Sequence, residues 1–110
     1  HALFQEIYED HFTAQDDLAE RIRSVGHTVD GRLQSMVNVS KVVEDEASAV
    51  KTDVEMIASL LEAQRIVAAT LSGASDIAAN DGDKLTEDLC IERGRVHEKF
   101  AWLLESHLGR

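Results

Sequence analysis

Three long segments of the chain repeat apolar residues at steps of three and four, and no proline interrupts any of them. This spacing places the apolar side chains along one side of an α-helix, whereas a proline inside the segment would end or kink the helix. Only 5% of the residues are aromatic, although 44% are hydrophobic. The sequence therefore predicts an all-α fold, and its 110 residues predict a single domain over 1–110.

The first long helix is predicted to end at Gly26, because glycine commonly follows the last helical turn. The stretch 26–31 is expected to be a loop. The segment "RLQSMVNVSKVVEDE" that follows is ambiguous, because its apolar residues fit a helix but its β-branched valines weaken one. We interpret it as a short helix within a long connection.

The second long helix is expected to run from near Ser48 to about Asn80, and "ANDGD" then forms a turn. The third begins beyond this turn, where Asp83 or Thr86 can cap its first residues, and it ends at Gly109. Bundles with short loops usually close with four helices, and a long connection fits a crossover of the ferritin type. We therefore expect a ferritin-like four-helix bundle, of which this chain carries three long helices, with a further helix before His1.

The formal net charge of −10 argues against unaided binding to nucleic acid, because such binding depends on lysine and arginine neutralising phosphates. No apolar run approaches the ~18 residues of a membrane span, and the first residues do not resemble a signal peptide. The single cysteine, Cys90, cannot form an internal disulfide, which is typical of a reducing cytoplasm. We expect a soluble cytoplasmic protein whose partners are cations.

Two stretches, "LAERIRSVG" and "TEDLCIERGRVHEKFAWLLESHL", resemble the Dps family of bacterial mini-ferritins, the starvation-induced DNA-binding proteins. The resemblance implies a subunit that assembles into a hollow dodecamer and acts in the bacterial cytoplasm or nucleoid. It also implies a ferroxidase, which oxidises ferrous iron with hydrogen peroxide and stores the ferric product. Such an enzyme would protect the cell and its DNA from oxidative stress.

The iron ligands of the family are carried over by this resemblance to His1, Gln5, Asp16 and Glu20, of which His1, Asp16 and Glu20 would be catalytic. Gln5 departs from the family pattern, in which this position is a carboxylate. An amide oxygen can coordinate iron, but it brings no charge and is a poorer ligand for a hard cation. The resemblance therefore predicts an iron site weakened at position 5.

The four ligand positions fall within roughly 100° of arc on one helix, but the two pairs lie about 20 Å apart along its axis. Positions 1 and 20, like positions 5 and 16, are symmetric about the midpoint between residues 10 and 11. Two copies of the helix, antiparallel about a two-fold axis there, would place His1 and Gln5 against Glu20 and Asp16 of the partner. The spacing thus favours two identical sites at a dimer interface.

Other readings of these residues stay open. Asp16 and Glu20 can be ordinary solvated acids, and the chain a helical interaction or scaffold module without bound metal. His11 is expected to pack rather than to bind metal, and His97 and Trp102 are expected to pack in the core or behind the metal ligands. Asp83 and Asp88 match acids that line a three-fold pore in the family, or else they interact favourably with the positive end of a helix.

Overall fold

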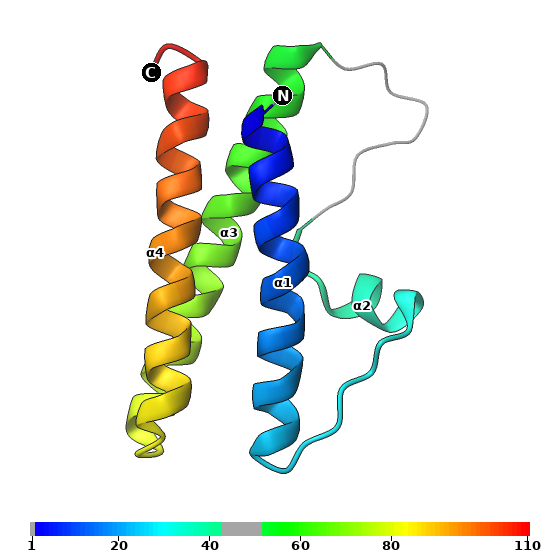
Figure 1. The fold of residues 1–110 in the computed structure, drawn as a ribbon, viewed down its shortest axis with the longest axis vertical. Helices are drawn as coiled ribbons and strands as arrows, with labels where there is room; N and C mark the ends of the chain where they lie inside the picture. Colours follow the sequence, from blue (N-terminus) through cyan, green and yellow to red (C-terminus); the bar gives the residue numbers. More distant parts are fainter. Residues whose placement is uncertain (1, 43–51) are drawn as a thin grey trace. The chain divides into compact units, whose positions relative to one another are not determined.

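The computed structural model describes residues 2–42 and 52–110, which fold into four helices and contain no strand. The chain divides into two compact units, His1–Ser40 and Lys41–Arg110. The first holds α1 and α2 and the second holds α3 and α4 (Figure 1). The all-α prediction is confirmed. None of the described helices is long and apolar enough to cross a membrane.

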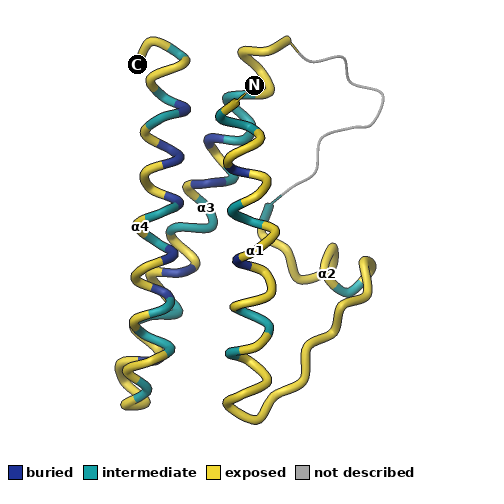
Figure 2. Tube along the Cα trace, in the orientation of Figure 1, coloured by how far each residue is buried: buried dark blue, intermediate teal, exposed yellow. Residues whose placement is uncertain are grey.

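Helix α1 spans Ala2–Ser24 and ends where predicted. Gly26 follows with a φ of 98°, a left-handed conformation that glycine adopts without steric cost. Two residues of α1, Ile7 and Ala14, are buried, and most of the others are exposed (Figure 2). The helix therefore has one narrow buried side and a wide exposed side.

Helix α2 spans Leu33–Val39 and confirms the short helix predicted in the connection. It has no side-chain N-cap and no buried residue, and Leu33 and Val39 are both largely exposed. Just before it, the Arg32 side chain donates two hydrogen bonds to the carboxylate of Asp30. These bonds hold the pKa of Asp30 well below its usual value.

Helix α3 spans Asp53–Asn80, so its end agrees with the prediction but its start does not. Thr52 has an extended backbone, and its side chain accepts a hydrogen bond from the backbone N–H of Glu55. A threonine in this position caps the helix, and the helix therefore begins at Asp53. The predicted start at Ser48 itself lies outside the described residues.

Helix α4 spans Lys84–His107, and the predicted turn and cap that precede it are confirmed. Gly82 in the turn has a φ of 74°, and the Asp83 side chain accepts a hydrogen bond from the backbone N–H of Thr86. Gly109, with a φ of 76°, follows the end of the helix as expected. α3 and α4 thus form a helical hairpin with a tight connection (Figure 1).

Most of the buried side chains of this hairpin are apolar and come from both helices, among them Leu61, Leu71, Phe100 and Leu104. Leu104 is fully buried and Leu61 is 2% exposed. The prediction that Trp102 belongs to the core is wrong, because its side chain is 62% exposed. Trp102 lies only two positions from Leu104, and two steps of about 100° turn it to the opposite side of α4.

Candidate metal site

The predicted ligands of α1 lie on its exposed side. Gln5, Asp16 and Glu20 are all exposed, and helix geometry places them about 170° around the axis from Ile7 and Ala14, the buried residues. His1, the fourth predicted ligand, lies outside the described residues. The side of α1 that carries the predicted ligands, which we call the outer face of α1, is therefore open for binding.

The structure brings two of the predicted ligands to adjacent turns and leaves a third apart. Asp16 and Glu20 are one turn, about 6 Å, from each other, whereas Gln5 is about 16 Å along the axis from Asp16. Over residues 2–42 and 52–110, no three His, Cys, Asp or Glu side chains come close enough together to hold a metal ion. A site that uses both ends of the outer face needs groups from another helix.

Gln5 is hydrogen-bonded to a carboxylate that is not among the predicted ligands. Its Nε2 donates to Oε1 of Glu9 over 2.8 Å, one turn further along the outer face. The bond uses the amide nitrogen, so the amide oxygen Oε1 is the atom of Gln5 that can coordinate a cation. Glu9 therefore places a negative charge beside Gln5, a predicted ligand that has none.

An aromatic pair also lies on this side of α1. Tyr8 and Phe12 stack with ring centroids 6.3 Å apart, and the side chains are 65% and 63% exposed. Phe12 lies near the middle of the outer face and Tyr8 at its edge. Neither residue was predicted to belong to the site, although position 12 pairs with position 9 about the same midpoint as the predicted ligands.

His11 does not belong to the outer face. Its imidazole is partly buried, and Nδ1 lies 3.1 Å from Oδ2 of Asp10. Helix geometry turns it more than about 100° away from the line through Gln5 and Asp16. His11 thus lies near the predicted midpoint along the axis but points to another side of the helix.

The two acids proposed for a pore have different environments at the start of α4. Asp83 is half-buried and caps the helix through Thr86, whereas Asp88 is exposed. Burial, and secondarily the negative charge of Asp83, raise the pKa of the Cys90 thiol. The capping role explains Asp83 without any cation, and Asp88 is the acid that remains available to solvent.

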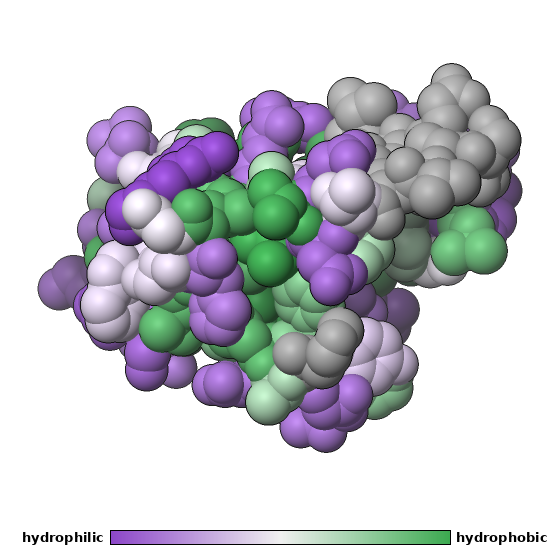
Figure 3. Space-filling model, turned by 90° about the horizontal axis from the view of Figure 1, so that it is seen from above, coloured by the Kyte–Doolittle hydropathy of each residue, from purple (hydrophilic) through white to green (hydrophobic). Residues whose placement is uncertain are grey.

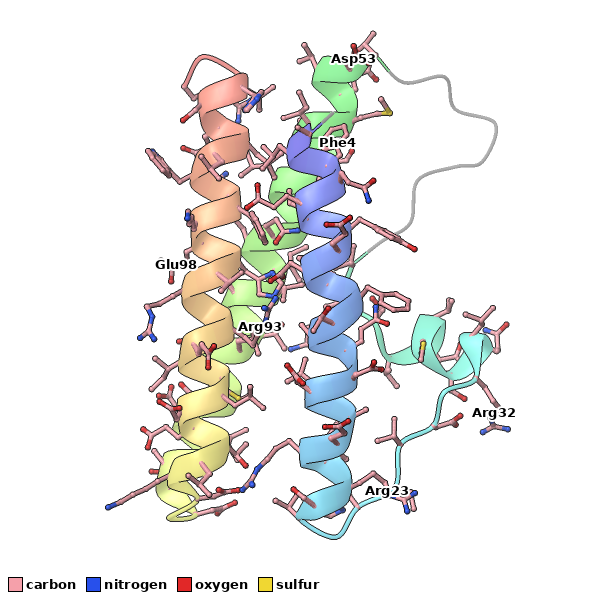
Figure 4. The ribbon with its side chains drawn as sticks, in the orientation of Figure 1. Phe4, Arg23, Arg32, Asp53, Arg93 and Glu98 are labelled. Carbon is pink, nitrogen blue, oxygen red and sulfur yellow. The ribbon has the colours of Figure 1, made fainter. Side chains whose placement is uncertain are left out.

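The hairpin buries a second set of polar side chains, Gln64, Arg93 and His97. His97 Nδ1 lies 2.8 Å from Gln64 Oε1, and Arg93 Nη2 lies 3.1 Å from His97 Nε2. Because a guanidinium can only donate, Nε2 must accept and Nδ1 must carry the proton. The imidazole of His97 is therefore neutral and hydrogen-bonded through both ring nitrogens, and it belongs to the hairpin interior. Arg93 and the exposed Glu98 lie on different sides of α4 (Figure 4).

Exposed apolar side chains are not confined to α1. In the view of Figure 3, apolar side chains (green) are visible at the surface among polar ones (purple). Large apolar residues exposed in the second unit include Val54, Ile77, Leu85 and Ile91. Both units therefore present apolar surface as well as acids.

Comparison with known proteins identifies the family. The ferritin-like domain family model matches residues 1–110. General stress protein 20U of Bacillus subtilis is 28% identical over 99% of this chain and 74% of its own length. A DNA protection during starvation protein of Brevibacillus brevis is 30% identical over 98% of this chain and 71% of its own.

Solved structures agree with this result. The crystal structure of Dps from Staphylococcus aureus is 30% identical in sequence and matches with a TM-score of 0.91. The match covers 98% of this chain and 71% of the Staphylococcus aureus chain. The helical arrangement expected from the sequence is thus that of known Dps subunits. The chain belongs to the ferritin-like family and, within it, is a Dps-type protein.

Proposed function

We propose that this protein oxidises and stores iron, with ferroxidase sites at the interface of a two-fold dimer. The observation that carries the proposal is the outer face of α1, on which Gln5, Asp16 and Glu20 are all exposed. Two of these side chains are carboxylates that are exposed on adjacent turns of one helix. Such a pair is suited to bind a cation. Membership of the Dps group, a family known for ferroxidase activity, supports iron as the cation.

The side chains at these positions suit ferrous iron as a substrate. Carboxylates from Asp16 and Glu20, an amide oxygen from Gln5 and an imidazole from His1 give the mixed oxygen and nitrogen donors that iron accepts. Two ferrous ions would each give one electron to hydrogen peroxide, which takes up two protons and leaves as two waters. Anionic ligands favour this step, because they stabilise the higher charge of the ferric product.

A second copy of α1 is needed to complete each site. An antiparallel partner would place its Asp16 and Glu20 against His1 and Gln5, and the same contact repeated by symmetry would make the second site. The exposed Phe12 near the middle of the outer face supplies apolar area to such a contact. Burial of an aromatic side chain is a large contribution to an interface.

The wider assembly follows from the same family membership. We expect homodimers to assemble further into a dodecameric shell in the bacterial cytoplasm, with ferrous iron and peroxide as substrates. Asp88, and with less support Asp83, would attract cations at a three-fold pore. The capping hydrogen bond of Asp83 favours its structural role.

Complementation between two damaged subunits tests the shared site. His1→Ala and Glu20→Gln each damage both sites of a homodimer, but a mixed dimer has one intact site and one with both defects. Random pairing makes about half of the dimers mixed, so coexpression should restore about a quarter of wild-type iron oxidation. Recovery no higher than the average of the two single variants would place the site within one chain.

The alternative is a helical interaction module that binds no metal. The 15 exposed large apolar side chains among the described residues favour association with other chains, but they do not indicate whether iron is bound. Native mass measurement with iron analysis separates the two functions. A shell near twelve times 12.2 kDa that takes up ferrous iron supports the ferroxidase, whereas a metal-free monomer or dimer supports the module.

A further inference from the structure

Glu9 is an acid on the outer face of α1 that is not one of the four predicted iron ligands. It is exposed, lies one turn from Gln5, and accepts the hydrogen bond of the Gln5 amide at 2.8 Å. Its carboxylate lies about 40° around the axis from Gln5, toward the midpoint of the face. The negative charge missing at position 5 is therefore present one turn away.

We propose that Glu9 is a positioning residue for iron binding, which orients the Gln5 amide and replaces the charge that Gln5 lacks. This inference rests on the proposed function, because it concerns the same iron site. Glu9 acts through Gln5, whose Oε1 is the coordinating atom. Residues 5 and 9 together would then do what a single carboxylate does elsewhere in the family.

The hydrogen bond selects one orientation of the amide. A glutamine side chain can turn either its oxygen or its NH₂ group toward a cation, and only the oxygen can coordinate. Donation from Nε2 to Glu9 fixes the nitrogen on the Glu9 side. Groups that hydrogen-bond to metal ligands orient them in the same way, and removing such groups typically weakens metal binding about 10–100-fold.

The charge of Glu9 acts over a short distance. A carboxylate one helical turn from the ligand lies about 5–6 Å from it, well inside the Debye length of about 8 Å at physiological salt. Its attraction for a divalent cation therefore persists under ordinary conditions. Glu6 has the same charge and is also exposed, but it points about 100° away from Gln5 and serves as a matched control.

Anaerobic titration calorimetry with ferrous iron tests the role of Glu9 in the assembled protein. We expect Glu9→Gln to weaken ferrous binding about tenfold or more, and Glu6→Gln to change it less than about twofold. Circular dichroism should show unchanged helix content in both variants, since both residues are exposed. Equal affinities of the Glu9→Gln and Glu6→Gln variants would overturn the proposal.

A swapped variant shows whether Glu9 acts through Gln5. Gln5→Asp combined with Glu9→Gln keeps the net charge and the amide–carboxylate pair, but it moves the carboxylate to position 5. We expect this double variant to bind ferrous iron at least as tightly as the wild type. Affinity no better than that of Glu9→Gln alone would contradict the inference, because position 9 would then act independently of Gln5.

Asp16→Asn separates failure of this inference from failure of the proposed function. If Asp16→Asn weakens ferrous binding and Glu9→Gln does not, the iron site stands and the role of Glu9 is wrong. If wild-type protein takes up no ferrous iron at all, the proposed function fails together with the inference.

Discussion

The α3–α4 hairpin and helix α1 use polar side chains in opposite ways. In the hairpin, Gln64, Arg93 and His97 are buried and hydrogen-bonded to one another within the interior. On α1, the acids and amides are exposed, and the buried residues are only Ile7 and Ala14. Polar groups that face inward must find protein partners to avoid a desolvation cost, whereas those that face outward can bind something else.

This difference separates folding from function. Changes inside the hairpin should lower the free energy of unfolding and leave the ligand set of α1 chemically intact. Changes on the outer face of α1 should alter binding and assembly while leaving the fold stable. The predictions below test this separation, in order of decreasing effect on the free energy of unfolding.

Truncating Leu104 should have the largest effect on stability. Its side chain is fully buried, so Leu104→Ala should lower the free energy of unfolding by about 2–5 kcal/mol, from lost apolar burial and the cavity that remains. Leu85→Ala on the same helix is the matched control and should cost less than about 0.5 kcal/mol, because Leu85 is largely exposed. Denaturant unfolding measures both, and equal losses would show that Leu104 is not a core residue.

Removing His97 should have the next largest effect. His97→Ala takes one hydrogen-bond partner from Gln64 and one from Arg93, which should cost about 1–3 kcal/mol of unfolding free energy. The exposed His107, which bonds the Leu103 carbonyl, provides the control, and His107→Ala should cost less than about 1 kcal/mol. If His97→Ala were as mild as His107→Ala, the buried polar set would not stabilise the hairpin.

The helices of both units could be predicted from the sequence because their determinants are local. Apolar spacing fixed the helical segments, and Gly26, Gly82 and Gly109 have the positive φ values expected of residues that end helices and turns. The start of α3 was misplaced because its apolar pattern extends upstream of Thr52. The capping side chain of Thr52, rather than the apolar periodicity, therefore determines where α3 begins.

The interior and the outer face were harder to predict, because both depend on which side of a helix meets another element. Trp102 was assigned to the core by residue type, yet its angular position turns it outward. Tyr8 and Phe12 were not assigned, although their exposure makes them the largest apolar side chains on that side of α1. The pairing of Gln5 with Glu9 required coordinates, since a spacing of four allows such a bond without requiring it.

Charging the aromatic pair should affect assembly rather than folding. Phe12→Asp should change the free energy of unfolding of the isolated subunit by less than about 0.5 kcal/mol, because the side chain is exposed. It should nevertheless prevent the two-fold dimer, since position 12 lies opposite position 9 in the proposed contact and the new carboxylate would face Glu9 of the partner subunit. Sedimentation velocity should then show subunits in place of the wild-type assembly, and an unchanged assembly would place the dimer contact elsewhere.

Neither unit should bind DNA measurably, and this is the smallest effect that we expect. Residues 1–40 contain three basic and seven acidic side chains, and residues 41–110 contain eight basic and fourteen acidic ones. Each unit is therefore net acidic, and the phosphate contacts that provide most non-specific affinity are opposed in both. A gel shift with plasmid DNA at about 0.15 M salt should show no retarded complex. A complex that disappears on Arg23→Glu, at the end of α1, but persists on Arg95→Glu in α4 would instead show that α1 binds DNA.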